Sequence, residues 1–153
     1  MSLKFSTGLR NGIMNATGVT EALNDGIIHI YSGSQPTSPD DAVQGTLLGK
    51  VTQDAGAWAA GAATNGLGFD TPSSGTLSKA AAENWQFNGA AAGTAGWFRF
   101  MGNAADALGS STTLPRIDGS IATYGADLNL SNVSITVGAP NTIDVFQLTM
   151  AEA

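Results

Sequence analysis

Trp97-Phe98-Arg99-Phe100-Met101 is the densest apolar stretch of this 153-residue chain, and it decides the fold. In a strand, side chains two positions apart share a face, so Phe98 and Phe100 lie on one side and the other three on the opposite side. Both faces are largely apolar. We therefore expect residues 97–101 to form a strand that is either central in a sheet or buried at a subunit contact.

Outward from this strand, short apolar stretches alternate with turns rich in Gly, Ser, Thr and Asn. Strands are predicted at residues 28–31, 46–53, 67–69, 84–88, 114–117, 126–130, 133–137 and 143–150. Several short strands separated by turns are typical of a sandwich rather than of a parallel sheet with crossover helices. The sequence therefore predicts a mainly β fold, an antiparallel β-sandwich or jelly-roll-like domain with a short N-terminal helical segment.

The opening of the chain follows a helical period instead. Apolar side chains recur at helical spacing at Phe5, Leu9, Ile13 and Ala16. Ser6 or Thr7 can cap this helix through a side-chain oxygen, and Gly18 can end it. Thr20 can then cap a second helical turn, which Gly26 can close in a left-handed conformation.

Residues 1–25 and residues 26–153 are thus predicted to be the helical segment and the β body of a single domain. Residues 32–42, which contain two prolines, are predicted to be an exposed loop because proline cannot continue a sheet ladder. Residues 55–63 are small apart from Trp58. They are predicted to be an extended arm or a mobile loop.

The composition argues against several classes of protein. The chain has a formal net charge of −6, and its six basic residues are scattered, whereas nucleic-acid binding needs clustered cations. With no cysteine, it has no disulfide framework or thiolate zinc site. Neither a signal peptide nor a membrane span is visible, so we expect no Sec export, no membrane anchoring, and synthesis in a cytoplasm.

Reactive side chains are few. His29 is the single imidazole, and it lies on the predicted polar side of its strand, with no Ser, Asp or Glu at the spacing of a nucleophile–base pair. Asp40 and Asp41 are the one adjacent carboxylate pair that could suggest glycosidase chemistry, but they follow a proline in a loop where water keeps both acids ordinary. We therefore predict no catalytic residue, no cofactor and no enzymatic activity.

A metal site is also not predicted. Hard oxygen ligands for calcium occur near turns at Asp118, Asp127, Asn129 and Asn132. They match neither an EF-hand loop nor a glycine-rich calcium repeat. The glycine clusters likewise lack the Lys-Ser/Thr pair of a phosphate-binding loop and are interpreted as turns.

The three tryptophans could stack against sugar rings. Trp85 and Trp97 lie in strands dense with other apolar residues, so we expect both in the core. Trp58 lies among alanines without strong periodicity, and it could instead anchor an arm on a neighbouring subunit.

Several stretches together resemble small structural proteins of tailed bacteriophages. They are Phe5-Ser6-Thr7-Gly8-Leu9-Arg10-Asn11, Ile30-Tyr31-Ser32-Gly33 through Pro36, Gly96-Trp97-Phe98-Arg99-Phe100, Ile117-Asp118-Gly119-Ser120 and Ala126-Asp127-Leu128-Asn129-Leu130. Within that group the chain is most similar to capsid decoration, or cement, proteins.

This resemblance implies a β-rich, often jelly-roll fold that binds the outer surface of the phage head and bridges major capsid protein subunits. It also favours a homotrimer, with a dimer as the next choice, and partners that are proteins rather than nucleic acid or membrane. Anchors for such contacts are expected at Phe5, Leu9, Arg10, Trp58, Trp97, Arg99 and Met101. Two alternatives remain open: a tail or baseplate component, and a glycan-binding module.

Overall fold

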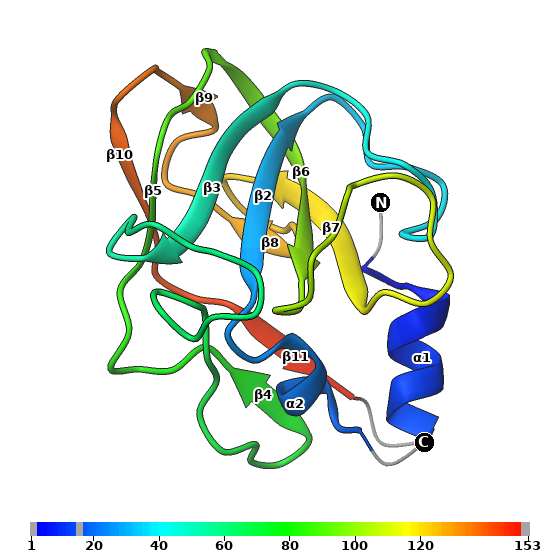
Figure 1. Ribbon diagram of the computed structural model, residues 1–153. Coiled ribbons are helices and arrows are strands. Elements are labelled where there is room, and N and C mark those ends of the chain that lie inside the picture. The colour runs from blue at the N-terminus through cyan, green and yellow to red at the C-terminus, as the bar shows by residue number, and fades with distance from the viewer. Residues whose placement is uncertain (1–2, 15–16, 151–153) are drawn as a thin grey trace.

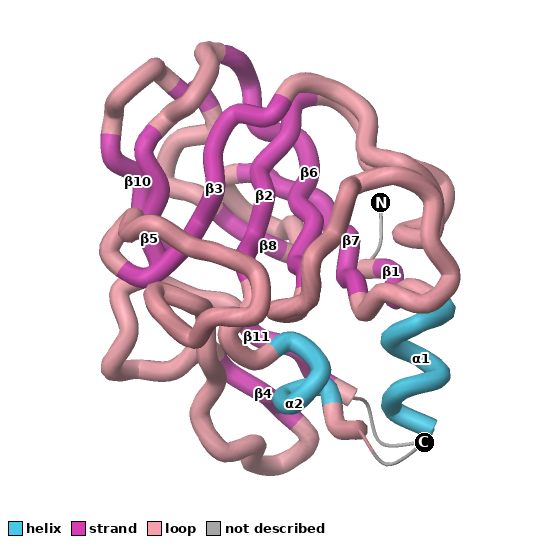
Figure 2. Tube along the Cα trace, viewed as in Figure 1, coloured by secondary structure: helices cyan, strands magenta, loops and turns pink. Residues whose placement is uncertain are grey.

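The computed structural model describes residues 3–14 and 17–150. Figure 1 and Figure 2 show two short helices at one end of a body made of strands and loops. The elements are, in chain order, β1 (Lys4–Phe5), α1 (Thr7–Met14), α2 (Val19–Leu23), β2 (Ile27–Ser32), β3 (Leu47–Gln53), β4 (Thr76–Ser78), β5 (Trp85–Asn88), β6 (Gly93–Met101), β7 (Arg116–Ala122), β8 (Leu128–Asn129), β9 (Ser134–Ile135), β10 (Pro140–Ile143) and β11 (Gln147–Thr149).

A nine-stranded sheet dominates the described residues. Its main path has the order β1-β7-β6-β2-β3-β5-β10, with β8 added to β7 and β9 added to β6. The pairing is antiparallel except between β7 and β8. Strands β4 and β11 form a separate two-stranded antiparallel sheet. These elements confirm the prediction of a mainly β, antiparallel fold with a short N-terminal helical segment.

Strand β6 is central, which is one of the two positions that its sequence allows. It lies between β2 and β7, and Phe98 is paired with Ile30 on one side and with Gly119 on the other. Trp97, Phe98 and Phe100 are all fully buried. Apolar side chains are needed on both faces of this strand because both faces are covered within the same chain.

Aromatic side chains form the centre of the core. The rings of Trp85, Phe100 and Phe146 lie 5.6–5.8 Å apart between centroids. Phe98 meets Phe146 edge to face at 5.8 Å, in a geometry that aromatic pairs prefer. Trp85 is fully buried on β5, so the prediction that it belongs to the core is confirmed.

Helix α1 is held to the sheet by Ser6, which confirms the predicted cap. The Ser6 hydroxyl is fully buried, accepts hydrogen bonds from the backbone N–H groups of Leu9 and Arg116, and donates to the carbonyl of Leu114. A Cβ at Gly8 would overlap the carbonyl oxygen of Thr113, so glycine is needed there for the helix to approach the loop that precedes β7 closely.

Replacing Ser6 by alanine is expected to lower the free energy of unfolding by about 2 kcal/mol, because it removes a helix cap and leaves a buried strand N–H without a partner. Urea denaturation of the S6A variant measures the loss. S34A, which changes an exposed loop serine, is the control and should stay within about 0.5 kcal/mol of the wild type. Equal stability of S6A and S34A would contradict this role of Ser6.

The second helical turn differs from the prediction in its details. Helix α2 begins after Gly18, which makes no side-chain cap, and Thr20 lies inside the helix. The left-handed residue that follows is Asp25, with a φ of 56°, and not Gly26. Gly26 is instead required because a Cβ there would overlap the carbonyl oxygen of Met101. Ala16, the last position of the predicted first helix, lies outside the described residues.

Several strand boundaries also needed correction. Residues 67–69 make isolated bridges to Gly26 and Lys79 and do not form a strand. The strand predicted at 114–117 continues to Ala122 as β7. The stretch predicted at 143–150 is broken, because β10 ends at Ile143 and β11 begins at Gln147 in a different sheet. The short strands β1 and β4 were not predicted.

Within the described residues, no helix is long and apolar enough to cross a membrane.

Candidate functional site

A row of polar side chains crosses one face of the large sheet, from β3 to β1. Lys50 is paired with His29, His29 with Arg99, Arg99 with Asp118, and Asp118 with Lys4. Directly opposed residues on neighbouring strands project to the same face and contact one another. The register of five strands therefore brings together groups that are up to 114 positions apart in the sequence, from Lys4 to Asp118.

Arg99 and Asp118 form the buried centre of this row. Nε of Arg99 lies 2.8 Å from Oδ1 of Asp118 and Nη2 lies 2.7 Å from Oδ2, with both side chains fully buried. Nη1 donates a third bond, of 3.0 Å, to the carbonyl of Asp41. Burial raises the pKa of Asp118 above its usual value, while the Arg99 guanidinium opposes that rise. A buried bidentate pair of this kind fixes geometry strongly.

A second bidentate pair is formed by Arg116, which lies two residues before Asp118 on β7, and Asp106. Arg116 donates to Asp106 through Nε at 2.7 Å and through Nη2 at 2.6 Å, and it also donates to the carbonyls of Pro39 and Gly109. Burial alone would raise the pKa of Asp106, but the hydrogen bonds from Arg116 and from the backbone N–H of Leu108 lower it below its usual value.

These two arginines hold two long loops, residues 33–46 and 102–115, against the sheet. The loops also bond to each other, through the N–H of Val43 to the carbonyl of Leu108 and the N–H of Ser111 to the carbonyl of Asp40. Residues 33–42 form a loop, and Ser32 is the last residue of β2. The loop is exposed only in part: Ser34, Thr37 and Asp41 are exposed, whereas Pro36 and Pro39 are buried.

His29 lies on the polar face of β2, as its sequence predicts, between Lys50 and Arg99. Only 7% of its surface is exposed, because the loops cover the face on which it lies. Its Nδ1 lies 3.2 Å from the hydroxyl of Tyr31. Burial, with a further contribution from the charge of Lys50, lowers the pKa of His29 to about 4, so the ring is neutral at pH 7.

Tyr31 and Trp97 continue the covered face beyond His29. Their rings are stacked, with centroids 4.6 Å apart. Burial raises the pKa of the Tyr31 phenol to about 12. The indole Nε1 of Trp97 is buried and has no hydrogen-bond partner in the described part of the chain.

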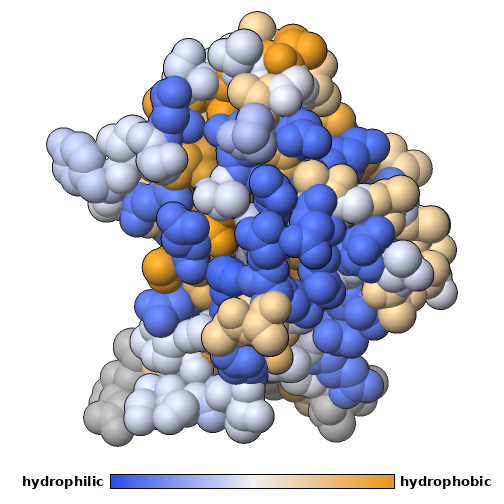
Figure 3. Space-filling model, turned by 90° about the vertical axis from the view of Figure 1, so that its left-hand side faces the viewer, coloured by the Kyte–Doolittle hydropathy of each residue, from blue (hydrophilic) through white to orange (hydrophobic). Residues whose placement is uncertain are grey.

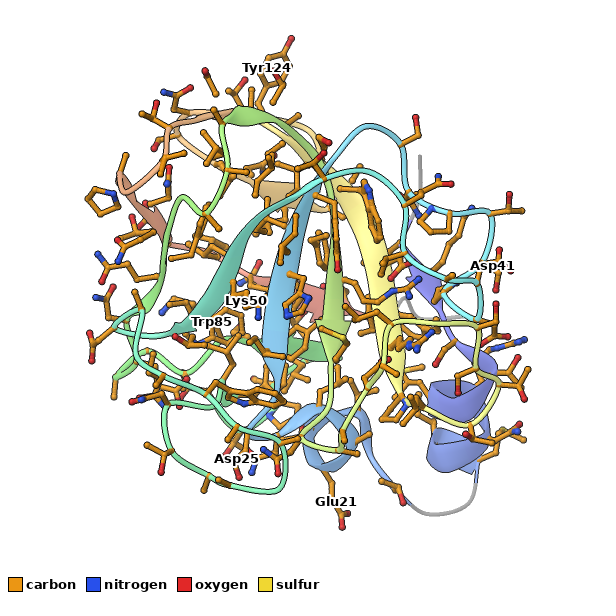
Figure 4. All side chains as sticks on the ribbon, turned by 45° about the horizontal axis from the view of Figure 1, so that its top comes forward. Glu21, Asp25, Asp41, Lys50, Trp85 and Tyr124 are labelled. Carbon is orange, nitrogen blue, oxygen red and sulfur yellow. The ribbon has the colours of Figure 1, made fainter. Side chains whose placement is uncertain are left out.

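Part of the polar face stays open as a groove of about 590 Å³, which we call the Lys50 groove. Its floor comes from β2, β3 and β5, and the loops on either side of it form its walls, both visible in front of the sheet in Figure 1. Figure 4 shows Lys50 on β3, over the side of the sheet turned to the viewer. The groove is lined by Ile27, His29, Lys50, Thr52, residues 55–58, Asn88, Ala90, Asp106 and Leu108.

Trp58 forms one wall of this groove. Residues 55–63 form a loop, and the alternative prediction of an extended arm is wrong, because the loop folds back on its own chain. Nε1 of Trp58 donates a 2.8 Å hydrogen bond to the carbonyl of Asp25, and the Asn65 side chain donates to the carbonyl of Ala57. Trp58 is half-buried, so part of its ring faces solvent.

The residues predicted as contact anchors lie in three different environments. Leu9, Trp97, Arg99 and Met101 are buried in the chain, which leaves them almost no surface for a partner. Their apolar and arginine groups serve the interior, and for Trp97 this confirms the prediction that it belongs to the core. Phe5 is half-buried and Arg10 is exposed, so with Trp58 they are the predicted anchors that still reach the surface.

The oxygen ligands considered for calcium already have hydrogen-bond partners within the chain. Asp118 is paired with Arg99, and Asp127 accepts hydrogen bonds from the N–H and hydroxyl of Ser120. The side-chain oxygens of Asn129 and Asn132 each accept from a backbone N–H nearby. Among the residues that the structure describes, there is no group of three His, Cys, Asp or Glu side chains able to hold a metal ion.

Asp40 and Asp41 also act separately. The carboxylate of Asp40 accepts hydrogen bonds from the backbone and hydroxyl of Thr7, while that of Asp41 accepts from the N–H of Ser38. The pair therefore holds the loop and the start of α1, rather than a substrate. In the Lys50 groove, the Thr52 hydroxyl donates to the carbonyl of Gly56, and Nδ1 of His29 lies against the Tyr31 hydroxyl.

A second, apolar groove of about 300 Å³ lies at the end of the molecule where β1, α2, β4 and β11 meet. Its apolar lining comes from Leu3, Phe5, Val19, Pro72, Leu77, Leu148 and Met150. We call it the terminal groove. Sequence reasoning identified Phe5 but none of its neighbours, because the groove is assembled from four separate segments.

Sequence reasoning also missed Lys50, Asn88 and Asp106 at the Lys50 groove. Alternation places Lys50 on the polar face of β3 and Asn88 on that of β5, but nothing local shows that these faces meet one cavity.

Comparison of the chain with known protein families, with curated proteins and with solved structures finds no match.

Proposed function

We propose that this chain is a structural protein of a tailed-phage virion, a decoration protein that binds the outer surface of the head and bridges major capsid protein subunits. The resemblance of its sequence to such proteins supports this function. The same proposal includes a homotrimer, and a jelly-roll-like sandwich in which the nine-stranded and two-stranded sheets are the two layers.

The terminal groove is the observation that carries the proposal. It is an apolar hollow at the surface, and Met150 at its edge is 70% exposed. Soluble proteins leave such apolar hollows open where another protein binds. We propose that an apolar segment of a shell subunit occupies this groove. Figure 3 shows a mostly hydrophilic surface at the β10 edge, which is less suited to such a contact.

Replacing Met150 by glutamate is expected to weaken binding to expanded phage heads by about tenfold or more, because a charge would enter an apolar contact. Co-sedimentation of the purified protein with heads that lack it measures this. M14E is the matched control, since Met14 is 88% exposed and does not line the groove. Binding of M150E that equals binding of M14E would contradict docking through the terminal groove.

Cryo-electron microscopy of the particle tests the wider proposal. Density for the chain on the outer head surface, between capsid subunits, is the expected result. Density confined to the tail would instead support a tail or baseplate component. A second copy of the chain in the terminal groove would make that groove the trimer contact and overturn its assignment to the shell.

A further inference from the structure

We propose that the Lys50 groove binds an acidic saccharide, with the sugar carboxylate on Nζ of Lys50 and a pyranose ring against Trp58. This inference does not rest on the proposed virion function. It would hold equally for a head, tail or free protein.

Lys50, Asn88 and Nε2 of His29, all on the floor of the groove, are available to a ligand, whereas other polar groups of the lining are already used. Thr52 donates to the carbonyl of Gly56, Trp58 donates to Asp25, and Asp106 accepts from Arg116. In contrast, the side chains of Lys50 and Asn88 have no hydrogen bond or ion pair to any residue in the ranges 3–14 and 17–150. The bond of His29 to Tyr31 uses Nδ1, which leaves Nε2 for a ligand.

The charge of the groove favours one anionic group. The chain as a whole carries −6, but Asp106, the carboxylate in this lining, is neutralised by its bidentate bond to Arg116. Lys50 is exposed and keeps an uncompensated charge. Both nearby guanidiniums are occupied by carboxylates, so they are not available as a bidentate phosphate clamp. A single ammonium with neutral donors matches a carboxylate better than a phosphate dianion.

Trp58 supplies a fixed apolar wall for a ring. Its neighbours in the lining, residues 55–57, are Ala, Gly and Ala, and such small side chains leave the indole accessible. The bond from Nε1 to Asp25 holds the indole in place before any ligand arrives. The negative face of an indole attracts the weakly positive C–H groups of a pyranose, and a preorganised wall lowers the entropic cost of binding.

Backbone strain is concentrated around this groove. Six described residues other than glycine have a positive φ: Asp25, Asp54, Ala55, Asn65, Ser74 and Leu108. Ala55 and Leu108 line the groove, and Asp25 and Asn65 hold the loop that carries Trp58. Aspartate and asparagine adopt this conformation readily, but it costs Ala55 and Leu108 about 1–2 kcal/mol each, and such strain tends to occur at functional sites.

A saccharide fits the groove better than an acidic peptide does. Volumes between about 300 and 1,000 Å³ are usual for sites that hold small ligands. The floor strands β2, β3 and β5 all lie inside the sheet, with partners on both sides. A peptide would therefore find no free strand edge to pair with, whereas hydroxyl groups need only the side chains of His29 and Asn88.

The test uses hyaluronan tetrasaccharide, with chitotetraose as its neutral counterpart, and isothermal titration calorimetry. We expect the acidic sugar to bind with a Kd in the micromolar to millimolar range, and K50M to weaken that binding by about tenfold or more. K4M is the matched control, because Lys4 lies at the far end of the same polar row, and it should bind as the wild type does.

Two further measurements keep the test decisive. N88A removes a floor amide without touching the Trp58 loop, and it should also weaken binding. In NMR spectra, the Trp58 Nε1–H resonance should shift on addition of the acidic sugar and not on addition of chitotetraose. Equal binding of both sugars, unchanged binding by K50M, or binding of pentaglutamate in preference to the sugars would overturn the proposal.

Discussion

Replacing Arg99 by methionine is expected to lower the free energy of unfolding by about 3–5 kcal/mol, the largest effect that we predict for a single residue. Arg99 is fully buried and makes two charge-assisted bonds to Asp118, of 2.8 and 2.7 Å. Methionine fills a similar volume but leaves the Asp118 carboxylate buried without its cation. The bond that holds the carbonyl of Asp41 is lost as well, so the loop over the sheet loosens.

Chemical denaturation of R99M measures the loss, and a double variant separates its causes. In R99M/D118L both charges are replaced by apolar groups, so most of the stability should return. K50M, which removes an exposed lysine from the same row, should change stability by less than about 0.5 kcal/mol. A loss below about 1 kcal/mol in R99M would contradict the role of the pair. If R99M does not fold, the stability of R99M/D118L still decides the question.

Lowering the pH from 7 to 4 is expected to destabilise the wild-type protein by about 3 kcal/mol through His29 alone. Burial is the main cause of its lowered pKa, which falls from 6.5 to about 4, and the charges of Lys50 and Arg99 add to it. Asp106 acts in the opposite direction but does not offset them. Between pH 6.5 and 4 the unfolded chain therefore takes up a proton that the folded chain refuses, and stability falls as the pH falls.

H29Q is the variant that isolates this effect, because glutamine does not titrate. Its stability at pH 7 can differ from that of the wild type, so the comparison is between the two slopes of stability against pH from 7 to 4. We expect a markedly flatter slope for H29Q. The pKa of Asp106 is also lowered, so protonation of Asp106 destabilises the folded state only at a pH below the ordinary pKa of an aspartate. Both the wild type and H29Q contain Asp106, so this contribution is the same in the two slopes. An NMR titration that gives His29 a pKa near 6.5, or identical slopes, would contradict the burial argument.

Local patterns were sufficient for the strands whose side chains alternate strongly. Trp85 and Phe87 on β5 are buried as the period of two predicts, and residues 97–101 of β6 are all buried, as expected for a strand with two largely apolar faces. The Ser6 cap was likewise visible, because a serine before a helical period has few other roles. The two-residue strand β1 and the three-residue strand β4 were not, because such short segments carry no detectable period.

The sequence by itself determined the mainly β, antiparallel class, a strand at residues 97–101 with two largely apolar faces, and the helical opening, because each depends on side chains close together in the chain. Only the tertiary structure decided that His29 is buried, that Arg99 and Arg116 hold two loops over the sheet, and that Lys50 shares a groove with Trp58. These features arise from cross-strand register and loop packing. Both bring together residues that are distant in the chain, and neither produces a periodic pattern of residue types in the sequence.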